Sequence, residues 1–168
     1  MAQVELIPAP EGSFLADHER IEVVYVDCYT TRHDGHVSLT ELIDAFYTSP
    51  LFKAERLVLR VMARSPSTDA DVRALATGEA QSFAAWRVEA RRDAEILLAD
   101  KAGRTKSWLS VKPDGAGTRL FFGSVVLPVK GRGGKPTLGP VFHSLLGAHK
   151  IYSQALLAAA GRRVAPAA

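Results

Sequence analysis

The sequence lacks several features that would indicate a particular class of protein. Its 168 residues contain one cysteine, and no apolar run approaches the roughly 18 residues that a membrane-spanning helix needs. One cysteine cannot form an internal disulfide, so we expect a reducing compartment and predict a cytoplasmic protein. The opening segment MAQVELIPAPEGSF lacks the basic start and long apolar core of a secretory signal.

Motifs for cofactors and nucleic acids are also missing. The glycine-rich segment KGRGGKPT at residues 130–137 does not match the phosphate-loop pattern G-x-x-x-x-G-K-[ST]. We expect a flexible hairpin or lid there and leave its role open. Because no zinc-finger, RNP-type or basic-helix signature occurs, we predict no nucleic-acid partner and no cofactor.

Acidic residues are nearly absent from the last part of the chain. Residues 1–100 hold 10 Lys/Arg and 17 Asp/Glu, a net charge of −7, whereas residues 101–168 hold 11 Lys/Arg and one acid, a net charge of +10. Such a basic part could attract an anion, an acidic membrane surface or nucleic acid. The interpretation we favour is simpler: both parts interleave in one domain and their charges mix on its surface.

Length and composition indicate one ordinary globular domain. Apolar residues make up 47% and charged residues 23% of the chain, values typical of a single packed core at this length. We predict a lead-in segment at residues 1–20, a domain at 21–161 and a flexible tail at 162–168.

The first half of that domain predicts a strand followed by helices. Residues 21–31, IEVVYVDCYTT, are rich in β-branched and aromatic types, and RHDGH then predicts a turn. Ser38 and Glu41 match a capping box, and Pro50 should end the helix that they begin. Residues 51–64 favour a second helix, although residues 55–62 remain open between helix and strand.

The second half predicts strands and one long helix. Residues 82–91, 93–100, 104–113 and 118–129 favour an antiparallel meander joined by short turns. A helix then begins near Pro140, and Gly161 is its expected C-terminal cap. The predicted fold class is α+β, a curved antiparallel sheet gripping the long C-terminal helix, with two short helices after the first strand.

Two segments carry a resemblance to a known family. VDCYTTRHDGHVSLTELIDAFYTSPLFKAERLVLRVMAR and AEILLAD with TKSWLSVKPDGAGTRLFFGSVV resemble a bacterial branch, of unknown function, of the START and polyketide-cyclase-like (SRPBCC) superfamily. The resemblance covers about residues 21–160 and implies a helix-grip fold. It also implies a cavity between the sheet and the C-terminal helix that suits a small apolar ligand.

The segment CYTTRHDGH invites a metal-site hypothesis. Cys28, His33 and His36 are ligand types that zinc accepts, but a structural zinc site needs four ligands and no second Cys/His pair occurs. A strand end, a turn and a helix cap explain the segment without a ligand, so we predict no metal. Cys28 is expected to be a buried, inert thiol.

Aromatic residues and one histidine are the candidate ligand contacts. Aromatic side chains line apolar pockets well, and a histidine on the flank of the C-terminal helix could face such a pocket. The predicted ligand-binding residues are Trp86, Trp108, Phe122, His149 and Tyr152. Core packing explains the aromatic residues equally well.

Three functions stay open at this point. The first is binding of a small hydrophobic or amphipathic molecule under the C-terminal helix. The second is a cyclase- or dehydratase-type enzyme that uses His149 with a carboxylate such as Asp27 as general acid or base. The third is a structural or interaction protein whose own side chains fill the cavity. A homodimer is kept open as the assembly.

Overall fold

A seven-stranded antiparallel sheet forms the centre of the computed structural model, which describes residues 3–54 and 67–164. The strand order is β1-β2-β7-β6-β5-β4-β3. The strands are β1 (Glu5–Leu6), β2 (Tyr25–Asp34), β3 (Ser82–Phe83), β4 (Trp86–Arg92), β5 (Glu95–Asp100), β6 (Thr105–Asp114) and β7 (Gly117–Val126). Short turns connect β4 through β7, which confirms the predicted meander.

Three described helices lie beside this sheet. They are α1 (Leu39–Tyr47), α3 (Asp69–Thr77) and α4 (Pro140–Arg163). The predicted capping box between Ser38 and Glu41 begins α1, and a second capping box between Thr68 and Asp71 begins α3. Residues 50–54 are helical as well, and the open question about residues 55–62 lies outside the described residues.

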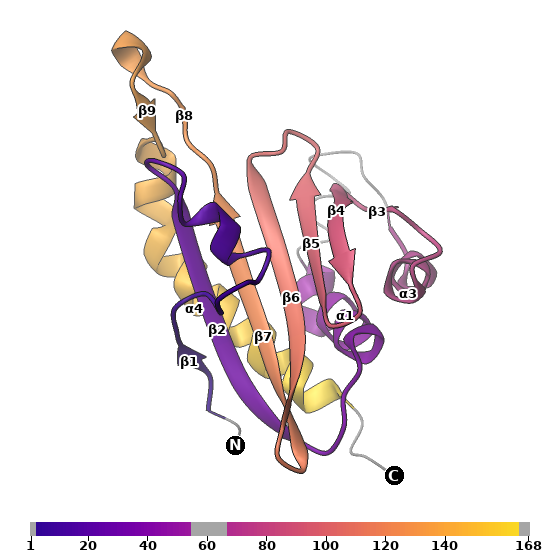
Figure 1. Cartoon of the computed structure of the whole chain (residues 1–168). Coiled ribbons are helices and arrows are strands. Elements are labelled where there is room, and N and C mark those ends of the chain that lie inside the picture. Colours follow the sequence, from indigo (N-terminus) through magenta and orange to yellow (C-terminus); the bar gives the residue numbers. More distant parts are fainter. Residues whose placement is uncertain (1–2, 55–66, 165–168) are drawn as a thin grey trace.

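The sheet separates two apolar layers. On one face α1, α3 and α4 pack against inward-facing side chains such as Tyr29 and Phe122. On the other face the N-terminal segment, which contains the short helix η1 (Ala16–His18), packs Leu15 against Trp108 and Phe121. Figure 1 shows η1 in front of the sheet and α4 behind it. This arrangement confirms the predicted α+β class, a sheet against a long C-terminal helix.

The first long strand lies later in the chain than predicted. Residues 21–23 form a turn in which Val23 has a φ of +59°, and the strand runs from Tyr25 to Asp34 instead of 21 to 31. Its end was also placed too early, because Arg32, His33 and Asp34 still pair with β7 and the turn falls at Gly35. A positive φ cannot continue an extended strand, so the β-rich composition of residues 21–24 misled the prediction.

Two other boundaries differ from expectation. Ala84 has a φ of +52° and divides the expected strand 82–91 into β3 and β4. Gly161 does not cap α4, which continues to Arg163. A Cβ at Gly161 would lie 3.5 Å from Thr31 Cγ2, which is an ordinary contact distance, so the packing of α4 against β2 has room for a side chain there.

The basic loop forms a small hairpin. Strand β8 (Val129–Lys130) pairs with β9 (Pro136–Thr137), and the 3₁₀ turn η2 (Arg132–Gly134) lies between them. In Figure 1 this hairpin extends beyond the sheet next to the start of α4. Within residues 3–54 and 67–164, no helix is long and apolar enough to cross a membrane.

Candidate functional site

A polar cluster lies where α4 crosses β2 and β7. On β2, Tyr25, Asp27 and Tyr29 share one face by strand alternation, and that face points toward α4. The backbone pairing places Asp27 directly opposite Ser124 of β7. His149 reaches this pair from the third turn of α4, so three separate elements supply the cluster.

The Asp27 carboxylate is held by several donors. Tyr25 Oη donates to Asp27 Oδ2 at 2.9 Å, and Ser124 donates to Asp27 Oδ1 from both its backbone N–H, at 3.1 Å, and its hydroxyl, at 2.5 Å. His149 Nε2 lies 3.4 Å from Asp27 Oδ2 and 2.9 Å from Ser124 Oγ. Only 3% of the Asp27 side chain is exposed, against 27% for His149.

These contacts keep Asp27 charged and Tyr25 neutral. Burial alone would raise the pKa of Asp27, but hydrogen bonds with His149 and Ser124 outweigh it and hold that pKa below the ordinary value. The pKa of Tyr25 is raised by burial and then by the neighbouring charge of Asp27. The contacts of His149 with both Asp27 and Ser124 are made by the same ring nitrogen, Nε2.

The cluster does not have the geometry of a nucleophilic triad. In such a triad the carboxylate binds one imidazole nitrogen and the serine binds the other. Here Nε2 of His149 contacts both Asp27 and Ser124, and the Ser124 hydroxyl gives its hydrogen to Asp27. Ser124 is therefore a positioning residue, whereas His149 can donate or accept a proton.

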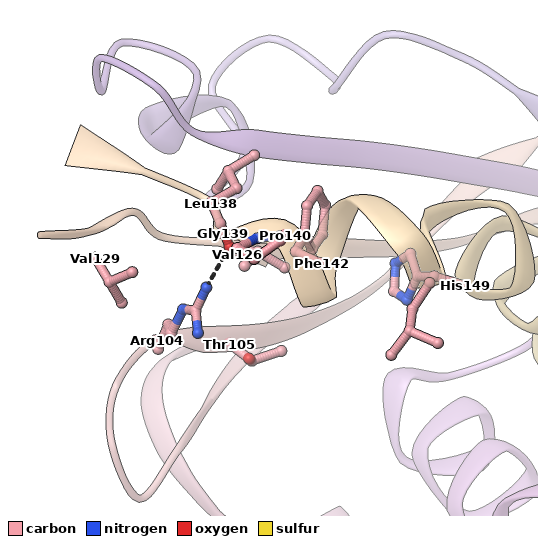
Figure 2. Close-up of a pocket in the computed structure, with 10 residues that line it drawn as sticks. Arg104, Thr105, Val126, Val129, Leu138, Gly139, Pro140, Phe142 and His149 are labelled. Carbon is pink, nitrogen blue, oxygen red and sulfur yellow. Dashed lines mark hydrogen bonds between the residues drawn. The ribbon is translucent and has the colours of Figure 1, made fainter. Parts of the chain in front are cut away.

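An outer groove of about 400 Å³ lies on one side of His149. Its lining residues are Arg104, Thr105, Val126, Val129, Leu138, Gly139, Pro140, Phe142, Leu145 and His149. Figure 2 shows Arg104 and His149 toward opposite ends of this row, with Phe142 between them. The groove is thus mostly apolar, with a basic side chain at each end.

Arg104 is the cationic end of the outer groove. Its guanidinium donates to the carbonyl oxygens of Leu138, at 2.7 Å, and Leu127, at 3.3 Å. Figure 2 draws the Leu138 bond as a dashed line. No carboxylate of the described residues forms an ion pair with it. An anionic group in the groove would therefore meet an uncompensated positive charge.

An inner cavity of about 150 Å³ lies on the other side of His149. Its lining residues are Phe46, Phe52, Trp86, Thr105, Lys106, Ser107, Phe122, Ser124, His149, Tyr152, Ser153 and Leu156. His149 and Thr105 belong to both linings, so the two spaces meet at these residues. An apolar space of roughly 150 Å³ is large enough for one benzene ring.

The structure brings together four of the five predicted contact residues. Trp86, Phe122, His149 and Tyr152 all line the inner cavity. Trp108 does not, which corrects the prediction for that residue. It faces the opposite side of the sheet among Leu15, Leu97 and Phe121, because its position on β6 alternates with those that face α4.

The segment CYTTRHDGH does not gather its candidate ligands. Cys28 and His33 are five positions apart on β2, so their side chains point to opposite faces of the sheet. His36 is exposed beyond the turn. Among the described residues there is no group of three His, Cys, Asp or Glu side chains that could hold a metal ion.

Sequence reasoning missed three polar residues of the site. On β7, Leu120, Phe122, Ser124 and Val126 share one strand face, and Ser124 is the polar residue among them. A polar residue in this apolar row could have been recognised in the sequence. Ser153 lies one helical turn after His149, on the same face of α4. Arg104 follows a turn and had no distinguishing pattern.

Comparisons with known proteins gave no match in sequence and a weak similarity to a solved structure. No protein-family model matches this sequence, and no curated protein matches it. Among solved structures, the chain is similar to CalU16 from Micromonospora echinospora, which was determined by solution NMR. The match has 11% sequence identity and a TM-score of 0.40, and it covers 99% of this chain and 75% of that one.

Proposed function

We propose that this protein is a helix-grip protein of the START and polyketide-cyclase-like kind that binds a small amphipathic molecule. The ligand places a ring-sized apolar part in the inner cavity and a polar part in the outer groove. The observation that carries the proposal is the position of His149, a polar side chain between two apolar spaces. Neither a metal nor a cofactor is needed for such binding.

The volumes limit the size of the ligand. Pockets for drug-sized molecules span roughly 300–1,000 Å³, so the inner cavity of about 150 Å³ is too small for a whole ligand of that kind. The outer groove of about 400 Å³ supplies the remaining space. Arg104 and His149 favour a carboxylate or another anionic group on the outer part.

The first experiment asks whether a ligand is already present. Native mass spectrometry of the purified protein would be followed by its denatured mass and by analysis of an organic extract. A mass excess that disappears on denaturation supports a bound small molecule. The native mass also decides between a monomer and a homodimer.

The second experiment uses the two tryptophans as reporters. Trp86 lines the inner cavity and Trp108 faces the other side of the sheet. Titration with 4-phenylbutyrate should change the emission of Trp108→Phe, which keeps only Trp86, and leave that of Trp86→Phe nearly constant. Equal changes in both variants, or none in either, would contradict binding in this cavity and favour a filled core.

The second candidate is an enzyme of the cyclase or dehydratase type. The observation that favours it is the contact between Asp27 and His149, since an oriented imidazole beside an apolar cavity suits general acid or base work. In that role His149 exchanges the proton and Asp27 orients the ring. If the extract contains a bound molecule, incubating it with protein and with His149→Ala separates conversion from mere binding.

A further inference from the structure

Two hydrogen-bond donors in the inner cavity have no partner. Of the six buried side-chain polar atoms that lack a hydrogen bond in the described part of the chain, Trp86 Nε1 and Ser153 Oγ belong to this cavity. Ser153 is only 1% exposed. A buried polar group without a partner destabilises a folded protein, so two such groups that line one small space require an explanation.

One tryptophan and one helical serine outside this cavity have the partners that Trp86 and Ser153 lack. Trp108 Nε1 donates to Glu95 Oε2 at 2.8 Å on the other face of the sheet. On α4 itself, Ser144 Oγ donates to the carbonyl oxygen of Pro140 at 2.9 Å, the usual bond of a serine within a helix. Ser153 does not make that bond, although it lies in the same helix. Trp86 and Ser153 therefore differ from Trp108 and Ser144, their counterparts outside the inner cavity.

Ser153 lies further along α4 than the residues that line the outer groove up to His149. The outer groove is lined by α4 residues up to His149, and Ser153 follows one helical turn later, about 6 Å further along the axis. A ligand that enters past His149 thus extends toward Ser153, and Trp86 of β4 lines the same cavity. Indole N–H groups only donate, so the matching ligand atom must be an acceptor.

We infer that the buried end of the ligand carries an oxygen acceptor, such as a phenolic hydroxyl or a carbonyl, which receives hydrogen bonds from Trp86 Nε1 and Ser153 Oγ. This inference rests on the proposed function and narrows it. The ligand is a small ring-shaped molecule with an oxygen at its inner end and a polar or anionic group at its outer end. The aromatic walls formed by Phe46, Phe52 and Phe122 hold the ring.

A matched pair of probes tests the inference. 4-Phenylbutyrate and 4-(4-hydroxyphenyl)butyrate differ by one hydroxyl group at the end remote from the carboxylate. Isothermal titration calorimetry of the unmodified protein should show the hydroxylated probe binding about five- to tenfold more tightly, because a site with unpartnered donors discriminates against a ligand that lacks the acceptor.

Two variants and one control locate the effect. Ser153→Ala and Trp86→Phe should each reduce the preference for the hydroxylated probe toward onefold, because each variant removes one donor to the hydroxyl oxygen of that probe. Ser144→Ala, on the exposed side of the same helix, should keep the full preference. Ser153→Ala should also melt no lower than the unmodified protein without ligand, since it removes a hydroxyl that has no partner.

The possible failures are distinguishable. If neither probe binds, the proposed function is wrong. If both probes bind equally well, the protein binds a ligand but the inference is overturned, and water is then the partner of the two donors. A preference that survives in Ser153→Ala and Trp86→Phe also overturns it. A marked loss of stability in Ser153→Ala would assign that hydroxyl a structural role instead.

Discussion

His149 Nε2 lies 3.4 Å from Asp27 Oδ2, and the Ser124 hydroxyl joins the two from 2.9 Å and 2.5 Å. This relationship ties the long helix to the neighbouring strands β2 and β7 through polar atoms. It also fixes the ring of His149 between the inner cavity and the outer groove. Four predictions follow from this arrangement and from its surroundings.

Asp27 should make stability depend on pH at the acidic end. Its pKa is held below 3.8 in the folded protein, so the folded state binds fewer protons than the unfolded state in that range. The stabilisation is fully present above pH 3.8 and is lost as the pH falls through the lowered folded pKa.

The variant Asp27→Asn removes this dependence. At pH 7 we expect it to lose about 2 kcal/mol of unfolding free energy, because the donors of Tyr25 and Ser124 lose a charged acceptor. Urea unfolding from pH 7 down to pH 2.5 measures the difference. The difference in unfolding free energy between Asp27→Asn and the unmodified protein should decrease as the pH falls. A difference that stays constant would contradict this account. Tyr25→Phe is the milder variant if Asp27→Asn fails to fold.

His149 should contribute to the affinity for a ligand, whereas His143 on the same helix should not. His149→Ala should weaken binding of 4-phenylbutyrate about fivefold, which corresponds to one hydrogen bond near 1 kcal/mol. His143 is exposed on the same helix and lines neither space, so His143→Ala is the control and should bind normally. Equal losses of affinity in the two variants would show that His149 has no specific role in binding the probe.

The Cys28 thiol should be unreactive in the folded protein. Burial, followed by the charge of Asp27, raises its pKa to about 12, so only about one thiol in ten thousand is ionised at pH 8. Reaction with an aromatic disulfide reagent should proceed only through opening of the structure and accelerate in urea. Rapid labelling without denaturant would show that the strand face around Cys28 is accessible.

Two glycine-to-alanine variants should change stability in opposite directions. A Cβ at Gly123 would lie 2.4 Å from Leu15 Cδ2 and 2.9 Å from the Asp27 carbonyl oxygen, so Gly123→Ala should destabilise by about 1–3 kcal/mol. Gly147 lies in α4 with no atom within 4 Å of a Cβ, and alanine favours a helix by about 1 kcal/mol. Thermal unfolding of both variants checks the signs.

The outcome for Gly123 also tests the N-terminal segment. Leu15 is fully buried against the sheet face that carries Trp108. If Gly123→Ala were as stable as the unmodified protein, Leu15 would not pack there, and the second apolar layer would not depend on the N-terminal segment.

Local sequence signals determined much of the fold. Ser38 with Glu41 fixed the start of α1, because a capping box needs only residues within one turn. Alternation along β2 placed Tyr25, Asp27 and Tyr29 on one face, because side-chain direction in a strand has a period of two. Turn residues predicted the breaks between β5, β6 and β7, because a short turn also depends only on residues that are adjacent in the sequence.

The tertiary structure decided whether each side chain faces the cavity or the opposite side of the sheet. Trp86 and Trp108 look alike in the sequence, each an aromatic residue on a meander strand. Both faces of this sheet are covered by apolar layers, so alternation could not tell the cavity side from the side of Leu15. Similarly, no local pattern could bring Asp27, Ser124 and His149 together, because their approach depends on strand register and on the path of α4 across the sheet.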